Sequence, residues 1–326
     1  MATNAGDDIS GIVEAVGSEV FEYKQGDRVA AFHRMETPHG GYAEYAIVPA
    51  STTFHLPAKI SFEAAAGLPL AFMTAAIGLY QMLRVPPPTE PGEKDFALLV
   101  YGGATAVGAY ALQLAKLSNV GSIITVAGRG IEFVESLGAA THVIDYRKGD
   151  VAQAILKALD GKKLHHVFDA VSSGNTHQIV SEILVANGGG KLNMLDPPTD
   201  KEWKWPAGID VSRTYVASAY SEKHADITQE QANADSDFAF LYYHYLARLL
   251  DEGRFKPHPH EVLSGGLGGI VEGVRRLHDG KVSATKLVVR FVDSSFHTMV
   301  VVLTALQNCR YSWSLVFIVS SWERIK

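Results

Sequence analysis

The sequence contains one cysteine, Cys309, in 326 residues. A single thiol can form no internal disulfide and cannot supply the cysteine pairs of a structural zinc site. We therefore expect no cysteine-based zinc site and a protein of a reducing compartment. The first eight residues are polar and lack the apolar core of a secretory signal, so we expect a cytoplasmic protein.

Long basic runs and uninterrupted apolar runs are also missing. The chain has 29 Lys and Arg against 35 Asp and Glu, and no patch suited to a phosphate backbone, so we expect no nucleic-acid partner. The longest apolar stretch, residues 296–322, is interrupted by Gln307, Asn308 and Arg310. A spanning helix needs about 20 predominantly apolar residues, and a central Arg costs at least about 2.5 kcal/mol. We therefore expect no membrane anchor and a poorly ordered tail.

What is present is a chain of globular composition, with 47% hydrophobic and 20% charged residues. Its length suggests about two domains. Residues 1–70 are β-rich, with alternating strands expected at 9–16 and 41–48. A helix follows at 71–83 and ends before three prolines at 86–88, which suit a rigid connector.

From residue 96 apolar runs alternate with helical periodicity. Strands are expected at 96–101, 122–127, 143–144, 166–169 and 191–195, and helices at 106–117, 131–137, 151–159 and 176–184. Repeated βα units predict an α/β fold: a Rossmann-like, doubly wound parallel sheet with helices on both faces. After residue 220 we expect helices at 238–250 and 268–277, a loop at 257–260, and a strand at 286–291 that returns to the first domain.

The glycine turn at residues 101–108 stands where a dinucleotide fingerprint belongs, after a strand and before a helix. It keeps Gly103 and Gly108 but has Thr105 at the middle glycine. Helix N-termini attract phosphate, so the turn predicts dinucleotide binding. An ordinary glycine-rich turn is the alternative.

The second strand ends without the acid that holds the ribose 2′-hydroxyl of NAD. Arg129 follows it instead, and a guanidinium suits a 2′-phosphate. This favours NADPH, although a solvated loop arginine is the alternative.

Short motifs run in order through the chain. They are Gly11-Ile12-Val13-Glu14-Ala15-Val16-Gly17, Gly26-Asp27-Arg28-Val29, Gly41-Tyr42-Ala43-Glu44-Tyr45, Val48-Pro49-Ala50, Val100-Tyr101-Gly102-Gly103, Ser136-Leu137-Gly138-Ala139, Ile144-Asp145-Tyr146-Arg147, Gly189-Gly190-Lys191, Gly280-Lys281-Val282-Ser283-Ala284 and Lys286-Leu287-Val288-Val289. With these motifs, about residues 6–293 resemble the medium-chain dehydrogenases/reductases. The similarity is to the zinc-independent fungal branch that includes the trans-acting enoyl reductases of polyketide synthases.

The resemblance implies a partial, β-rich GroES-like catalytic domain at 1–75 and an NADP-binding Rossmann domain at 76–225. The chain would return to the catalytic domain at 226–293 and end in an unmatched tail at 294–326. Relative to the family, about 50 to 60 residues would be missing before Gly6. We therefore expect an N-terminally truncated chain with an unrelated tail.

The resemblance also assigns cofactor residues in five groups: the pyrophosphate turn, the 2′-phosphate loop, the adenosine ribose, the nicotinamide side and a closing edge. In that order they are Gly103, Ala104, Thr105, Ala106, Val107 and Gly108; Ala127, Gly128, Arg129 and Gly130; Tyr146; Leu195 and Asp196; and Val282 and Ser283. Tyr146 could instead be a core aromatic, and Val282-Ser283 a plain turn.

Substrate is expected between the two domains, against two segments that resemble pocket segments of the family. They are Phe72, Met73, Thr74, Ala75 and Ala76, and Tyr215, Val216, Ala217 and Ser218. Thr74 is the side chain expected to contact nicotinamide or the substrate carbonyl, with a helix N-cap as the alternative.

The implied reaction is NADPH-dependent reduction of an activated C=C bond by an enoyl reductase in secondary metabolism. Its substrate would be an enoyl or enone group. For the enoyl reductase, a carrier domain of a polyketide synthase could carry the enoyl group. A quinone or small-enone reductase of the same fold, or an inactive binding protein, are the alternatives. We expect a monomer or homodimer.

The resemblance assigns no role to two further sets of side chains. The proton donor has three candidates, His33, His39 and Tyr42, for which surface solvation is the alternative. The histidines at 165–166 and 258–260 lack supporting cysteines or an HExxH helix, and we interpret them as loop histidines rather than metal ligands.

Overall fold

The computed structural model describes residues 6–41, 45–90, 96–225, 227–292, 298–305 and 313–315. The chain divides into two compact units. One comprises the described residues up to Met73 and those from Ala217 onward, and the other comprises Thr74–Val216.

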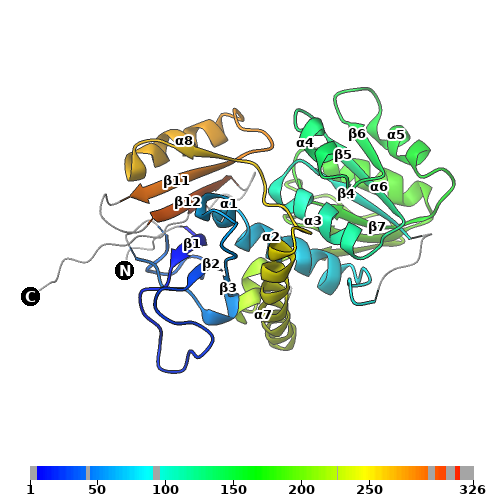
Figure 1. The fold of residues 1–326 in the computed structure, drawn as a ribbon. Helices are drawn as coiled ribbons and strands as arrows, with labels where there is room; N and C mark the ends of the chain where they lie inside the picture. The colour runs from blue at the N-terminus through cyan, green and yellow to red at the C-terminus, as the bar shows by residue number, and fades with distance from the viewer. Residues whose placement is uncertain are drawn as a thin grey trace, which may run out of the picture. The chain divides into compact units, whose positions relative to one another are not determined.

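The Thr74–Val216 unit contains a six-stranded parallel sheet in the order β6-β5-β4-β7-β8-β9 (Figure 1). Its strands are β4 (Ala97–Tyr101), β5 (Ser122–Ala127), β6 (His142–Asp145), β7 (Leu164–Asp169), β8 (Gly190–Met194) and β9 (Ile209–Arg213). β4 and β5 are buried along their whole length, as expected for apolar strands covered on both faces.

Four helices connect these strands: α3 (Ala106–Leu117), α4 (Ile131–Ser136), α5 (Val151–Ala158) and α6 (Thr176–Ala186). Right-handed crossovers place α3 and α4 on one face and α5 and α6, which contact each other, on the other face. The sheet is therefore doubly wound, which confirms the predicted α/β class. The chain runs from β4 outward to β6 and then returns to β7, so the strand order reverses between β4 and β7.

The other unit is built on a sheet in the order β10-β11-β12-β1-β2-β3, with β13 added on β12. All pairs in it are antiparallel except β10 with β11. The strands are β1 (Asp8–Ile12), β2 (Arg28–Phe32), β3 (Thr53–His55), β10 (His260–Leu263), β11 (Lys286–Val292), β12 (Thr298–Ala305) and β13 (Trp313–Leu315). Helix α8 (Gly269–His278) packs its apolar side against a core that includes Ile9 and Leu287.

The remaining helices range from single short turns to the longest helix of the described residues. Helix α2 (Pro69–Ala76) continues as a π-helical segment, η2 (Ile77–Met82), and α7 (Gln229–Asp251) is a long helix capped by Thr228. The shorter ones are α1 (Phe62–Ala66), η1 (Ala50–Thr52), η3 (Val216–Tyr220) and η4 (Gly266–Gly268). Among the described residues, no helix has the length and apolarity needed to cross a membrane.

Several strand predictions were wrong. The strand expected at 9–16 ends at Ile12, and residues 45–48 carry no strand, while Tyr42, Ala43 and Glu44 lie outside the described residues. The loop expected at 257–260 already begins β10 at His260, and β9 was not predicted.

Two helices differ from their predicted bounds. The helix expected at 71–83 begins at Pro69, since proline suits a first helical position. It becomes π-helical where the Leu83 N–H donates to the carbonyl of Gly78. The helix expected at 238–250 begins at Gln229, because its first turns are polar and Thr228 caps them. The other predicted helix and strand ends after residue 95 lie within two residues of the structure.

The expectation of a poorly ordered tail was wrong for residues 298–305. They form β12, which pairs with β11 on one side and β1 on the other, and β13 pairs with β12. A run of Val and Leu in this segment favours an extended strand, and the pairing satisfies its backbone groups. The rest of the predicted tail lies outside the described residues.

Candidate cofactor-binding and active site

The turn between β4 and α3 is wound tightly against β5. The N–H groups of Gly102 and Gly103 donate to the carbonyl of Val126 at 3.1 and 3.0 Å, and Gly102 has a φ of 92°. A Cβ at Gly103 would lie 2.2 Å from the Thr125 hydroxyl. Only glycine therefore fits at Gly103, and the start of α3 is held at the end of β4.

Thr105, the departure from the fingerprint, is the N-cap of α3. Its hydroxyl donates to the carbonyl of Gly102 and accepts from the N–H of Gly108, both at 2.9 Å. A Cβ at Gly108 would lie 2.2 Å from the Gly102 carbonyl oxygen, so this glycine is also needed for packing. The turn carries Ala104, Ala106 and Val107 into the first turn of a twelve-residue helix. The first N–H groups of a helix have no partner within it, so the turn fits a phosphate group.

At the carboxyl ends of β5 and β6, the predicted cofactor residue Tyr146 lies against two others, Ala127 and Gly128. Tyr146 donates its N–H to the carbonyl of Ala127 at 3.1 Å, and a Cβ at Gly128 would lie 2.4 Å from the Tyr146 ring. Tyr146 is 52% exposed, so it is not a core aromatic. Arg129 is exposed beside buried Gly128, and buried Gly130 precedes α4.

A charged pair that the sequence analysis did not single out lies at the same edge. Nε and Nη2 of Arg147 each donate to the Asp145 carboxylate at 2.8 Å. These hydrogen bonds lower the pKa of Asp145 to about 2, and Lys148 lies 3.8 Å away. The available signal was the position of an acid and an arginine, two residues apart, at the carboxyl end of a strand.

The ends of β7 and β8 are joined through Asp169 and Ser172. The Asp169 carboxylate accepts the N–H groups of Val171 and Ser172 at 3.0 and 2.9 Å. The Ser172 hydroxyl donates to the Asp169 carbonyl at 3.0 Å and accepts from the Leu195 N–H at 2.8 Å. Burial raises the pKa of Asp169, and burial beside Asp169 and Tyr146 raises the pKa of Tyr101, the last residue of β4, to about 12.

Leu195 and Asp196 follow β8 and are both contacted by Arg213. Its Nε donates to the Leu195 carbonyl at 3.1 Å, and its Nη2 lies 3.7 Å from Asp196. Burial raises the pKa of Asp196, and Arg213 opposes that shift. Asp196 lines a small pocket at the carboxyl ends of β7 and β8, together with Asp169, Ser172, Thr176, His177 and Met194.

The predicted substrate residues of α2 are buried. Phe72 lies in an aromatic cluster, with ring centroids 6.2 Å from Tyr243 and 5.5 Å from Phe255. Thr74 is 6% exposed and lies past the first turn of α2, so the N-cap alternative was wrong. The other members, Met73, Ala75 and Ala76, are fully buried.

The second predicted substrate segment spans the boundary of the two units. Tyr215 and Val216 are half-buried in the Thr74–Val216 unit. In the other unit Ala217 is buried, and the Ser218 hydroxyl donates to Asp235 of α7 at 2.6 Å. The Ser218 side chain therefore supports α7.

Val282 and Ser283, the predicted closing edge, belong to the same unit as Ser218. Val282 packs against the core under α8, and Ser283 is exposed. Their part in cofactor binding stays a prediction.

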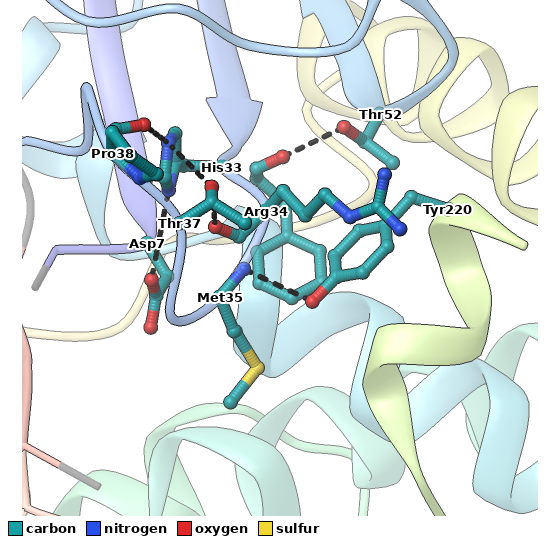
Figure 2. Close-up of polar contacts among 9 residues, drawn as sticks. Asp7, His33, Arg34, Met35, Thr37, Pro38, Thr52 and Tyr220 are labelled. Carbon is teal, nitrogen blue, oxygen red and sulfur yellow. Dashed lines mark hydrogen bonds and ion pairs between the residues drawn. The ribbon is translucent and has the colours of Figure 1, made fainter. Parts of the chain in front are cut away.

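Figure 2 shows the surroundings of His33, one candidate proton donor. His33 is 1% exposed, and its Nε2 donates to the carbonyl of Pro38 at 3.2 Å. Its Nδ1 has no hydrogen-bond partner and lies 3.9 Å from the Asp7 carboxylate. Solvation was therefore the wrong alternative for His33, although His39 is exposed; Tyr42 lies outside the described residues.

The loop after His33 is held by Tyr220 of η3. The Met35 N–H donates to the Tyr220 hydroxyl at 3.0 Å, and Arg34 lies over the Tyr220 ring (Figure 2). Arg34 also lies 3.5 Å from Glu222. The same unit therefore ties the predicted donor loop to the segment that contains Ser218.

Three of the four histidines were wrongly placed in loops, whereas His258 does lie in a loop. His165 and His166 lie in β7, and His260 begins β10. Burial lowers the pKa of His166 to about 4, and its ring lies 4.6 Å from Phe96. In the part of the chain that the structure describes, no three His, Cys, Asp or Glu side chains are grouped to hold a metal ion.

Two family models match the chain. The alcohol dehydrogenase GroES-like domain matches residues 1–58, and the zinc-binding dehydrogenase domain matches residues 106–196. The trans-enoyl reductase fsr4 of Gibberella fujikuroi is 41% identical over 269 residues, which cover 80% of this chain and 75% of that protein. The trans-enoyl reductase buaC of Petromyces alliaceus is 33% identical over 297 residues, covering 88% and 82%.

Solved structures share the fold. The CurK enoyl reductase is similar with a TM-score of 0.63 at 21% identity, covering 87% of this chain and 77% of that one. A quinone oxidoreductase of Pseudomonas syringae is similar with a TM-score of 0.65 at 24% identity, covering 88% and 82%. At these identities the two structures do not separate the two activities.

Proposed function

The chain belongs to the medium-chain dehydrogenase/reductase family, among its trans-enoyl reductases, and on this premise we propose that it reduces the C=C bond of an enoyl thioester with NADPH. It is an oxidoreductase of a family that uses a nicotinamide cofactor. The choice of NADPH, the thioester substrate and a polyketide synthase carrier domain as its donor are parts of the proposal. The single cysteine fits a cytoplasmic location.

The observation that carries the proposal is the arrangement around the strand-order reversal between β4 and β7. In open α/β sheets, ligands bind outside the carboxyl ends of the strands at such a point. Here that edge carries the capped turn at Thr105, the exposed Arg129 and the Asp169–Ser172–Leu195 hydrogen bonds. These residues fit the three parts of a dinucleotide: pyrophosphate, adenosine and nicotinamide.

Different residues at this edge would bind different parts of the dinucleotide. The N–H groups of Ala106 and Val107 would hold the pyrophosphate, and Arg129 with Tyr146 would hold the 2′-phosphate and ribose. Leu195 and Asp196 would face the nicotinamide side. When bound, the nicotinamide supplies the hydride of the reaction.

Preference for NADPH follows from the charges at the ends of β5 and β6. An acid after β5 would repel a 2′-phosphate, and this chain has Arg129 there instead. The acid that ends β6, Asp145, is bound to Arg147 and does not present a free carboxylate. This edge therefore attracts a phosphate.

Reduction of an activated C=C bond places negative charge on the thioester oxygen, which hydrogen-bond donors stabilise. We assign this role to the hydroxyl of Thr74. A metal is not part of the proposal, although one matching family model is described as zinc-binding, because the chain has one cysteine. His33, His39 and Tyr42 stay candidates for the proton donor.

The test is NADPH consumption by the purified protein with a short enoyl thioester, with a quinone, and with neither. Formation of the saturated thioester by mass spectrometry would support the proposal. Faster turnover of the quinone would favour the quinone-reductase alternative. Cofactor binding without any turnover would mark a binding protein.

Thr74→Val and Thr74→Ser provide the matched pair for the assigned donor. Removal of one oxyanion donor costs about 100-fold in kcat, and the serine variant should keep most of the rate. An unchanged kcat in Thr74→Val would remove Thr74 from the reaction without affecting the cofactor assignment.

A further inference from the structure

The ends of β5 and β6 place two arginines at equivalent positions. The strands are parallel neighbours, and their last register pair joins Ala127 to Asp145. Arg129 and Arg147 each stand two residues beyond that pair, and neighbouring strands lie about 4.8 Å apart. Between them, the Tyr146 ring contacts Gly128. Both guanidinium groups therefore start from the same edge of the sheet.

Arg147 is fixed in a way that an ordinary surface arginine is not. Asp145 accepts from its backbone N–H at 3.0 Å as well as from Nε and Nη2 at 2.8 Å. The Asp145 side chain is 7% exposed, whereas that of Arg147 is 49% exposed. One edge of the guanidinium group, formed by Nε and Nη2, is thus bound to Asp145. About three of the five guanidinium N–H groups stay available to a ligand.

We infer that Arg147, held by Asp145, is a second arm of the 2′-phosphate site beside Arg129, and that Asp145 is the residue that positions it. This inference rests on the proposed NADPH-dependent function. It adds Arg147 and Asp145 to the residues that would select NADPH over NADH. An acid after β5 selects against a 2′-phosphate, but Asp145 at the end of β6 selects for one through the arginine that it orients.

The physical reason is preorganisation. A free arginine side chain loses rotamer freedom when it binds a phosphate, and a side chain already held loses less. Arginine also presents a planar fork, which lysine lacks. Lys148, 81% exposed at 3.8 Å from Asp145, adds charge to the same edge without comparable fixation.

The test uses two small probes, 2′,5′-ADP and 5′-AMP, which differ in the phosphate under study. Isothermal titration calorimetry measures both on the full chain. The unmodified protein should prefer 2′,5′-ADP, and Arg147→Ala should reduce that preference about 10-fold or more with little change for 5′-AMP. Lys163→Ala is the matched control, because it removes one exposed cation before β7 at the opposite edge.

Asp145→Asn separates positioning from charge. Removing a carboxylate makes the edge more positive, so charge alone would tighten binding of 2′,5′-ADP. Loss of positioning should weaken it instead, about 3- to 10-fold for one weakened contact. Arg147→Lys, which keeps the charge and loses the fork, should also weaken it, and it serves as the second variant if Asp145→Asn folds poorly.

Two results would overturn the inference in different ways. If Arg147→Ala and Arg147→Lys keep the full preference while Arg129→Ala removes it, Arg147 is outside the site and the proposed function stands. If the unmodified protein binds both probes equally, the NADPH assignment itself fails, and the inference fails with it.

Discussion

The ammonium group of Lys286 lies 3.3 Å from the carboxylate of Asp8, although 278 residues separate them in the chain. Both side chains are almost fully buried, at 5% and 2% exposed. The other Asp8 oxygen accepts the N–H of Leu70 in the first turn of α2. At the same turn, the hydroxyl of Tyr243 donates to the carbonyl of Pro69 at 2.9 Å. One buried ion pair thus joins β1, β11 and the helix that carries Thr74.

Replacing Lys286 by Met should lower the free energy of unfolding by about 3 to 5 kcal/mol, because it leaves the Asp8 carboxylate buried without its partner. Chemical denaturation measures the change. Lys281→Met, at an exposed ion pair with Asp279, is the control and should change stability by less than about 1 kcal/mol. The double variant Asp8→Asn with Lys286→Met should be less destabilised than the sum of the two single variants; additive losses would contradict a direct interaction.

Thr105→Ala should cost about 1 kcal/mol of stability, since it removes the N-cap of α3, and Thr105→Ser should restore most of it. Thermal unfolding with and without NADPH measures both effects. If alanine and serine behave alike, the hydroxyl does not cap the helix in solution.

Arg129→Ala should reduce the ratio of NADPH to NADH affinity by about 10- to 150-fold, the value of one charge-assisted contact. Fluorescence titration with both cofactors gives the ratio. Lys162→Ala, an exposed cation at the amino end of β7, should leave it unchanged. Equal curves for the two cofactors in the unmodified protein would contradict the assignment.

His166 should make the protein less stable as the pH falls from about 6.5 to about 4. Its pKa in the fold is lowered to about 4, mainly by burial, from an ordinary value of about 6.5. Between these values the unfolded chain binds a proton that the folded chain does not, so acidification favours unfolding. We expect a loss of about 1 to 2 kcal/mol after allowance for partial solvent exposure.

Melting temperatures of the unmodified protein and of His166→Leu across this pH range measure that loss. The leucine variant should lose less stability on acidification. His165→Leu, at the exposed neighbour, should follow the unmodified protein. Parallel curves for all three proteins would show that His166 does not titrate in this range.

Purified without added metal, the protein should contain no stoichiometric zinc and should keep its activity in the presence of a chelator. The single cysteine cannot supply the thiolate ligands of a structural zinc site. Elemental analysis and activity after chelation test this. Stoichiometric zinc that is lost together with activity would refute it.

The segment from β4 to β5 was predictable because its apolar pattern, its turn residues and its helix cap all indicate the same structure. Two apolar runs form strands, the glycines allow a tight turn, and Thr105 caps α3 at Ala106. β9 was not predictable, because its residues are half-buried and polar as well as apolar at the sheet edge. β12 depends on pairing with β1, almost 300 positions earlier, which no local pattern contains.

The candidate site shows the same division. Arg129 could be found because it lies just beyond a strand where an NAD enzyme would have an acid, and Tyr146 because it stands in a motif that resembles one of the family. The hydrogen bond from Leu195 to Ser172 could not, because it depends on the register of β7 against β8. The Asp145–Arg147 pair was visible as a motif, but its bidentate geometry was not.

The raised pKa of Tyr101, about 12, has a consequence for how this edge responds to its surroundings. The pKa of Asp145 is lowered to about 2, so neither group changes charge at physiological pH. Arg147 stays cationic throughout, because its hydrogen bonds to Asp145 raise the pKa of its guanidinium further. A 2′-phosphate, with a second ionisation near pH 6, changes charge within that range. Tyr101, Asp145 and Arg147 therefore keep their charges across this range, and a bound 2′-phosphate would be the group at this edge whose charge depends on pH.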